Sequence, residues 1–162
     1  MKTHSLYHIS SRCMLVVSLL AGGAGITSAA VAGECPAGMT KADATKPVTT
    51  PAVGVTDTTL GSIDLGKEPA MIKDRELRFR KLTIEPGGVV PWHSHDDRPA
   101  LIYVAQGEIV EYASNCAAPI VHKTGDLRRE TSETSHWWKN LGDATVILLV
   151  ADVRHDTTDH HM

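Results

Sequence analysis

The sequence has little net charge and no internal repeat, and after Leu60 it has no helical periodicity that lasts for three turns. A formal net charge of −3 over 162 residues excludes a dedicated nucleic-acid-binding protein, because such proteins carry a basic excess. With 42% hydrophobic and 22% charged residues, the chain is neither disordered nor collagen-like. Its length fits one domain with an appendage and excludes a multidomain assembly.

The amino-terminal region lacks a good membrane-spanning segment. The apolar run Met14–Leu20 is too short and its continuation too rich in glycine for a spanning helix. It follows a basic start and leads to an Ala-x-Ala triplet at Ala30–Ala32, which is typical of a secretory signal peptide over residues 1–32. The alternative is an uncleaved anchor. We expect residues 33–162 to be exported, periplasmic or secreted, without membrane contact after cleavage.

Cysteine is scarce, and removal of the signal peptide leaves only Cys35 and Cys116. In an oxidising compartment these two residues are a natural disulfide pair. The bond would attach the amino-terminal arm to the domain. The alternative is two unrelated thiols, because sequence separation does not fix their distance in space.

Residues 33–162 divide into three parts that differ in composition and residue pattern. Residues 33–59 contain prolines, many threonines and few large apolar side chains, so we expect an extended arm. Residues 60–153 alternate short β-like runs with glycine-containing turns, and residues 154–162 form a histidine-rich tail that we expect to be solvated. The apolar residues change from odd to even positions between Phe79 and Leu82, so the apolar side chains would change face on a regular strand. This change predicts a β-bulge.

The short runs predict an all-β domain, either a sandwich or a barrel. The expected strands are residues 77–84, 89–95, 100–105, 109–112, 120–122, 127–130, 136–139 and 145–153.

Three histidines are candidate metal ligands. His93 and His95 are two residues apart, so on a strand both side chains lie on one face and can bind one cation. His136 opens a later strand and is the third candidate. A half-apolar pocket favours the neutral imidazole, which is the form that binds metal. For His122 we expect a core or surface position.

Two segments resemble the signature motifs of the cupins. Gly87 to Gly107, with its Pro-Trp-His-Ser-His core, is similar to the first motif, a glycine, five residues, His-x-His and a closing glycine. Gly125, His136 and Asn140 match the second motif in register. The resemblance implies a small single-domain cupin: a jelly-roll β-barrel or sandwich, with an extended amino-terminal arm and the metal inside the barrel.

The sequence departs from the family pattern at three positions. Ala100 stands where the first motif has a glutamate ligand, and a methyl group cannot bind metal. Thr131 and Glu133 replace the proline and second glycine of the second motif. The implied centre is therefore His93, His95 and His136 without a carboxylate.

A three-histidine site leaves coordination positions open, which is the catalytic arrangement. We expect a divalent metal, with Fe(II) first and Mn, Ni or Zn as alternatives. Arg98 could clamp an anionic substrate group if it points inward, or pair with a neighbouring aspartate if it points outward. Tyr112 could donate a proton if it lies beside the metal, although the sequence leaves its face undecided.

The hypothesis favoured by these residues is a metal-dependent, dioxygenase-like enzyme that acts on a small organic substrate. An anionic substrate is one possibility. A non-catalytic cupin that binds a small ligand or metal for sensing or storage is one alternative. A metal-dependent lyase or isomerase is the other. Small cupins resemble one another in forming dimers through sheet faces, so we also expect a homodimer.

Overall fold

The computed structural model describes residues 33–155, so the predicted signal peptide and all but the start of the histidine-rich tail lie outside the described residues. This region is all-β and contains no helix. Its strands are β1 (Val53–Asp64), β2 (Glu76–Ser94), β3 (Ala100–Gln106), β4 (Glu108–Ala113), β5 (Ile120–Lys123), β6 (Leu127–Glu130), β7 (Ser135–Lys139) and β8 (Val146–Arg154). Within residues 33–155, therefore, no helix is long and apolar enough to cross a membrane.

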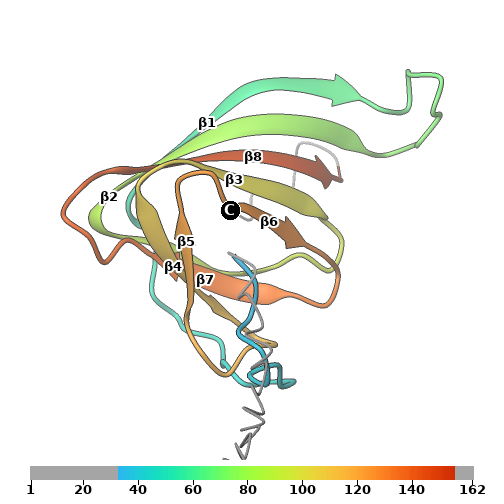
Figure 1. The fold of residues 1–162 in the computed structure, drawn as a ribbon. Coiled ribbons are helices and arrows are strands. Elements are labelled where there is room, and N and C mark those ends of the chain that lie inside the picture. Colours follow the sequence, from blue (N-terminus) through green and yellow to red (C-terminus); the bar gives the residue numbers. More distant parts are fainter. Residues whose placement is uncertain (1–32, 156–162) are drawn as a thin grey trace, which may run out of the picture.

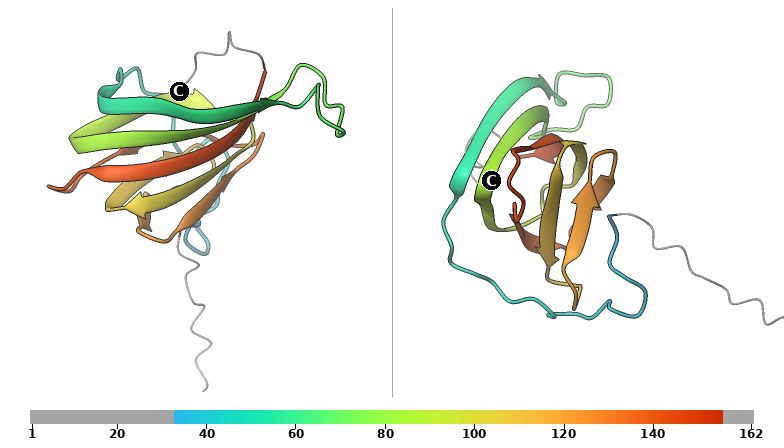
Figure 2. Two further views of the ribbon diagram at one scale, coloured as in Figure 1. Left: turned by 90° about the horizontal axis from the view of Figure 1, so that it is seen from above. Right: turned by 60° about the vertical axis from the view of Figure 1, so that its left-hand side comes forward.

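The strands form one curled antiparallel sheet in the order β5-β4-β7-β2-β8-β3-β6, with β1 added along β2 (Figure 1). Strand β2 has different neighbours along its length. Its first half, Glu76–Ile84, pairs with β1 and β8, whereas its second half pairs with β7. The sheet therefore folds over itself at β2, and its two halves face each other across an interior (Figure 2). This is the jelly-roll arrangement expected from the sequence.

Strand β2 corrects one expectation about the strand order. Residues 77–84 and 89–95 were expected to be two strands, but they belong to a single strand that bends at Pro86-Gly87-Gly88. A Cβ atom on Gly88 would lie 2.7 Å from the Ile84 side chain and 2.8 Å from the Glu85 carbonyl oxygen. Only glycine fits this bend, so the turn-like sequence marks a change of neighbours rather than the end of a strand.

The predicted bulge between Phe79 and Leu82 is wrong for β2. This strand pairs with β8 residue for residue over Glu76–Ile84, and the nearby register shift lies in β1 instead. Phe79 faces outward and is 43% exposed, whereas Leu82 is buried. The inward positions before Leu82 hold Arg78 and Arg80, both buried. The alternation of apolar residues is interrupted because the inward positions 78 and 80 hold charged side chains.

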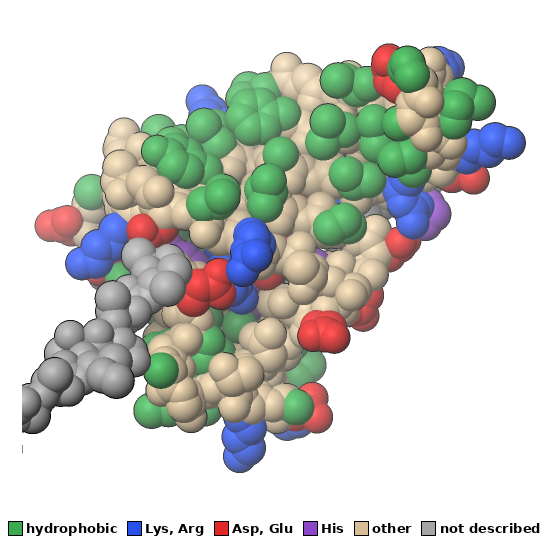
Figure 3. All heavy atoms as spheres, turned by 45° about the vertical axis from the view of Figure 1, so that its right-hand side comes forward, with side chains coloured by type: hydrophobic (Ala, Val, Ile, Leu, Met, Phe, Trp, Pro, Cys, Tyr) green, Lys and Arg blue, Asp and Glu red, His purple; other side chains and the backbone are tan. Residues whose placement is uncertain are grey.

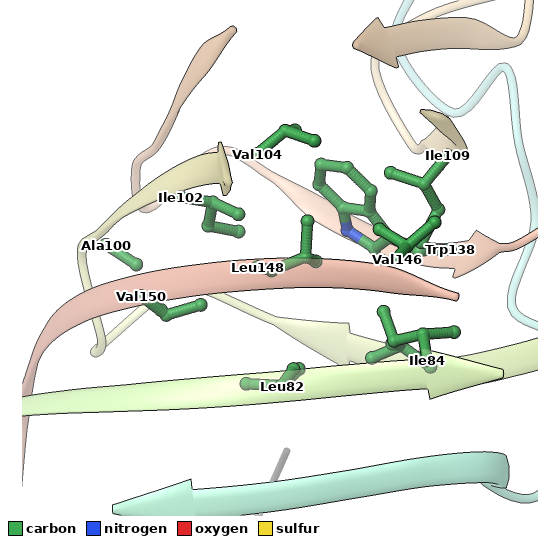
Figure 4. Close-up of a cluster of buried hydrophobic side chains, with 11 residues drawn as sticks. Leu82, Ile84, Ala100, Ile102, Val104, Ile109, Trp138, Val146, Leu148 and Val150 are labelled. Carbon is green, nitrogen blue, oxygen red and sulfur yellow. The ribbon is translucent and has the colours of Figure 1, made fainter. Parts of the chain in front are cut away.

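The interior is apolar at one end and charged at the other. The apolar end is a cluster of side chains from both halves of the sheet (Figure 4), consisting of Leu82, Ile84, Val90, Ala100, Ile102, Val104, Ile109, Trp138, Val146, Leu148 and Val150. Along the inner face of β2 and β8, the paired positions change from Ile84 opposite Val146 to Arg78 opposite Asp152. The fold thus places polar chemistry at one end of an apolar barrel.

The segment before β1 runs along the outside of the domain (Figure 2). The predicted disulfide between Cys35 and Cys116 is present, and an isolated bridge joins Thr40 to Cys116. Closing a chain segment of 81 residues contributes about 4 kcal/mol to stability. Strand β1 begins at Val53, inside the segment expected to be an arm, so that segment ends as an added strand.

Asn140, which matches the second motif, has a structural role. Its buried side-chain amide donates to the carbonyl oxygens of Ile84, Glu85 and Ala144, and its oxygen accepts from the Gly142 backbone. These bonds attach the bend of β2 to the turn between β7 and β8. The bend brings the second half of β2 beside β7, so Asn140 supports the position of the histidines.

We expect Asn140→Ala to lower the free energy of unfolding by about 2–3 kcal/mol, because three carbonyl groups, one of them buried, lose their donor. Urea denaturation measures the change. The control is Gln106→Ala, whose exposed amide donates to the carbonyl oxygen of Thr145, and which should change stability by less than about 0.5 kcal/mol. Equal effects of the two substitutions would contradict the role assigned to Asn140.

Candidate metal centre

The structure brings together the three histidines named from the sequence. His93 on β2 lies opposite His136 on β7, and His95 follows the end of β2. The Nε2 atoms are 3.2 Å apart between His93 and His95, 3.0 Å between His95 and His136, and 3.0 Å between His93 and His136. His95 and His136 are buried and His93 is half-buried. We call these residues the three-histidine cluster.

The other ring nitrogen of each histidine fixes its tautomer. In chain order, the three Nδ1 atoms lie 2.9 Å from the carbonyl oxygen of Pro91, 2.8 Å from that of Arg98 and 2.8 Å from the carboxylate of Glu111. These oxygens only accept hydrogen bonds, so each Nδ1 carries the proton. Each Nε2 of the neutral rings then presents a bare lone pair to the other two.

This arrangement fits a metal ion. Three lone pairs about 3 Å apart repel one another unless a cation lies between them. Two imidazole nitrogens, each about 2.1 Å from one ion and at right angles, are about 3.0 Å apart, which matches the separations in the cluster. The three residues therefore form a group that could hold a metal ion.

Burial keeps two members of the cluster neutral. The pKa of His95 is lowered to about 3, first by burial and then by the charges on His136 and Arg98. Burial and the charge on His136 also hold the pKa of His93 well below its usual value. Both rings are therefore unprotonated at neutral pH, as metal binding requires.

His136 differs because it contacts two buried carboxylates. Its Nδ1 lies 2.8 Å from Glu111 Oε1 and 3.2 Å from Glu130 Oε1. Burial opposes the charged ring, but these carboxylates outweigh burial and raise the pKa of His136 to about 9. Without metal, the ring holds a second proton at neutral pH. A metal ion would displace this proton, so metal affinity should rise with pH up to about 9.

The carboxylate of Glu111 belongs to a buried polar network that sequence reasoning missed. His122 donates to it through Nε2 at 2.8 Å, and Arg128 contacts both Glu111 and Glu130. Burial opposes ionisation of Glu111, but the hydrogen bonds from His122 and His136 outweigh it and lower the pKa of Glu111. The network thus keeps a negative charge behind His136, which makes this ligand more basic.

Two carboxylates flank the position of the missing glutamate ligand. Ala100 on β3 pairs with Glu130 on β6 and with Asp152 on β8, in one row across the inner face. Glu130 contacts the Nδ1 side of His136, away from the shared Nε2 atoms, and Asp152 is engaged by arginines. Neither belongs to the group formed by the three histidines. The cluster therefore has nitrogen donors only.

Arg98 points inward, the first of the two orientations considered from the sequence. It is 3% exposed, and its Nη1 lies 3.7 Å from Asp152 Oδ2. Arg78 makes a two-pronged contact with the same carboxylate at 3.0 and 2.6 Å, and Arg80 Nε lies 3.6 Å from it. Arg80 also bonds Asp57 on β1. The role of Arg98 toward a ligand stays a prediction.

Tyr112 faces away from the cluster. Its ring stacks on Trp137, with ring centroids 4.2 Å apart and planes 9° from parallel. The preceding residue, Glu111, contacts His136, and side chains alternate across a strand. Tyr112 therefore lies on the outer face of β4, and the proposed catalytic role for it is not supported. Trp138 is on the inner face, with its indole Nε1 3.2 and 3.3 Å from the His136 ring nitrogens.

Two hollows adjoin the cluster. Inside the barrel, His93, His95, Arg80 and apolar side chains enclose about 10 Å³ for the centre of a water-sized group, the room that one water or ion needs. A wider open cleft of about 410 Å³ lies at the mouth, between Arg75, Asp97 and Ser132. His95 contributes to the lining of both hollows.

Comparison with known proteins agrees with this arrangement. Residues 80–152 match the family model of the Cupin domain. No curated protein matches the sequence. Three solved structures are similar at low identity: the Cnp3 cupin domain of Schizosaccharomyces pombe, a conserved double-stranded β-helix protein of Klebsiella pneumoniae, and a predicted oxalate decarboxylase of Thermotoga maritima.

The first of these is 15% identical, with a TM-score of 0.49 over 67% of this chain and 71% of that chain. The Klebsiella protein is 17% identical, with a TM-score of 0.49 over 69% of this chain and 84% of that chain. The Thermotoga protein is 18% identical, with a TM-score of 0.44 over 65% of this chain and 99% of that chain. Similarity at this level carries no inference about activity. The matched family model, the curled antiparallel sheet and the inward-facing histidines identify the chain as a small cupin-domain protein.

Proposed function

We propose that this protein is an exported metal-dependent enzyme of the oxygenase type, which acts on a small organic substrate at the three-histidine cluster. The observation that carries the proposal is the convergence of three histidine Nε2 atoms within 3.2 Å of one another. A closed structural site has four protein ligands, whereas three leave positions open for substrate. Fe(II) is the first candidate, with Mn, Ni and Zn as alternatives.

The residues around the cluster have separable tasks. The three histidines hold the ion, which when bound supplies Lewis acidity and, in the case of iron, electrons for oxygen chemistry. Apolar neighbours such as Leu82, Ile102 and Leu148 exclude water from the adjoining cavity. Arg98 would favour an anionic group on the substrate through its fixed positive charge.

The small cavity favours a second candidate, a non-catalytic cupin that holds a metal or a small ligand for sensing or storage. The room for about one water-sized group beside the cluster suits storage of an ion as well as turnover. A lyase or isomerase would use the same centre without oxygen. These candidates differ in what they consume, which an experiment can measure.

Export is supported by the disulfide bond that joins the amino-terminal arm to the domain. The bond between Cys35 and Cys116 persists in an oxidising compartment and is rare in a reducing cytosol. Together with the signal-like residues 1–32, it supports a periplasmic or secreted location.

A homodimer through the outer face of the sheet is the expected assembly. Leu101, Tyr103 and Leu127 are 48%, 42% and 48% exposed on neighbouring strands, with Phe79 nearby on β2. Hydrophobic side chains also gather across the upper part of the face shown in Figure 3. An antiparallel sheet usually has polar residues on its solvent face, so this face suits contact with a second copy.

Elemental analysis of protein purified without chelators should find a divalent metal at about one ion per chain. We expect His93→Ala to remove most of it, because two imidazoles do not complete the site. The matched control is His155→Ala, a half-exposed histidine that contacts Asp97 outside the cluster. Equal metal content in the His93 variant and the wild type would contradict the assigned centre.

Loading the metal-free protein with Fe(II) should produce oxygen consumption when small organic acids are supplied. An oxygen electrode measures the uptake, and protein loaded with Zn(II) is the control because zinc has no redox chemistry. Substrate conversion without oxygen uptake would indicate the lyase or isomerase. Stable metal binding without conversion of any substrate would indicate the storage or sensing protein.

Glu111→Gln should weaken metal binding by about 10-fold to 100-fold, because the amide still accepts from His136 but its negative charge is lost. Competition against a coloured chelator measures this affinity. The matched control on the same strand is Glu108→Gln, whose exposed carboxylate pairs only with Lys123 among the contacts described for residues 33–155, and which should leave affinity unchanged. If the two variants bind metal equally well, Glu111 does not support the centre.

A further inference from the structure

One ring nitrogen of His122 has no partner in the polar network behind the metal centre. The His122 side chain is fully buried, and its Nε2 donates to Glu111 Oε2 at 2.8 Å. With the proton on Nε2, the Nδ1 atom of the neutral ring is a hydrogen-bond acceptor. Nδ1 is buried and makes no hydrogen bond in the described part of the chain. Because a buried acceptor without a donor is costly, a donor is expected on this side of the ring.

Gly33 lies against this nitrogen. It is buried, and a Cβ atom on it would lie 3.1 Å from His122 Nδ1 and 3.7 Å from the Cβ atom of Asp126. Its φ angle is +79°, a conformation that favours glycine. The backbone therefore approaches the imidazole with no side chain between them, and the Gly33 nitrogen is bonded to the same Cα atom that would carry the Cβ.

The two residues that follow hold Gly33 in place. Glu34 accepts a hydrogen bond from Arg128 at 3.1 Å, and Cys35 is bonded to the buried Cys116. The start of the segment is thus ordered by an ion pair and a disulfide. A further hydrogen bond from Gly33 then costs little additional conformational entropy.

The donors on the Gly33 nitrogen depend on what precedes it. In the intact chain this nitrogen is an amide with one N–H, whose direction the peptide plane fixes. Hydrolysis of the Ala32–Gly33 bond by a signal peptidase consumes one water, leaves a carboxylate on Ala32 and gives Gly33 an ammonium group. The three N–H donors of this group rotate about the bond to Cα, and the neighbouring negative charge of Asp126 favours an ammonium group. Cleavage therefore creates at Gly33 the kind of donor that His122 lacks.

We propose that the α-ammonium group of the processed chain binds beside His122 and Asp126 and donates to His122 Nδ1. Removal of the signal peptide then completes the network behind the metal centre. The inference rests on the export proposed above and gives the new amino terminus a binding site. The terminus is a positioning group: it fixes the ring of His122, which holds Glu111, which in turn holds His136. The precursor lacks this interaction, so only the processed protein reaches full stability.

Intact-mass measurement of the exported protein should give a chain that begins at Gly33. An exported chain that begins elsewhere overturns the proposal, because its amino group would not lie beside His122, and it leaves the three-histidine cluster standing. A chain that is neither exported nor processed overturns the export proposed above together with this inference.

The main test compares the processed chain with an otherwise identical chain that retains Ala32, both oxidised and in the same buffer. We expect the retained residue to raise the equilibrium constant of unfolding, measured by urea denaturation, by about tenfold, since a buried acceptor loses a charged donor. The matched background is His122→Gln, whose amide nitrogen can still donate to Glu111 but which has no ring nitrogen at the position of Nδ1. There the retained Ala32 should change the constant by less than about twofold. An unchanged constant in the wild-type background, or the same change in both backgrounds, overturns the proposal.

Nitrogen-15 NMR of histidine-labelled protein tests the contact without a substitution in the interior. The Nδ1 resonance of His122 should differ between the two chains, because a hydrogen bond from a charged donor changes the electron density at this nitrogen. The control is His155, an exposed residue that contacts Asp97 and whose resonances should coincide. Coinciding His122 resonances would show that the amino terminus does not reach Nδ1, and they overturn the proposal.

Discussion

The hydrogen bonds made by the three Nδ1 atoms determine what the interior of this protein can do. Each Nδ1 proton is committed to a fixed oxygen, on Pro91, Arg98 or Glu111, so the three Nε2 atoms are held facing one another. If any of these acceptors were lost, its ring could turn or change tautomer, and one lone pair would leave the cluster. Two of the acceptors are backbone carbonyls, so the path of the chain around residues 91–98 is itself part of the site.

The bend of β2 connects this local chemistry to the whole fold. One strand contributes Arg78 and Arg80 to the interior before the bend and His93 after it, and Gly88 permits the bend by having no side chain. Asn140 holds the bend against the following turn. The barrel can therefore place Arg80 and His93 from the same strand in the lining of one cavity, together with members of the apolar cluster.

Most strands and the three-histidine cluster could be predicted from the sequence, because each follows a regular pattern. Alternation and turn residues located most strands within one or two residues, and the spacing of His93, His95 and His136 within the motifs located the cluster. The inward charges could not be predicted in this way. Arg80 occupies an inward position and so interrupts the alternation of apolar residues along β2. Because charged residues usually face solvent, the interruption indicates a bulge when the sequence alone is considered. The face of Tyr112 stays undecided from the sequence, because the residues that share its face on an alternating strand are one charged, Glu108, and one apolar, Val110.

Ala100 stands at the position of the family glutamate, between two strands that carry buried carboxylates. The carboxylates are displaced by one strand on either side, to Glu130 and Asp152, rather than removed from the interior. Glu130 acts on His136 from the far side of its ring, and Asp152 holds the arginines together. Negative charge that would bind an ion directly instead adjusts a ligand and organises a cationic wall. An ion held by the three histidines would have one protein ligand fewer than with a glutamate at position 100, and buried arginines would lie nearby.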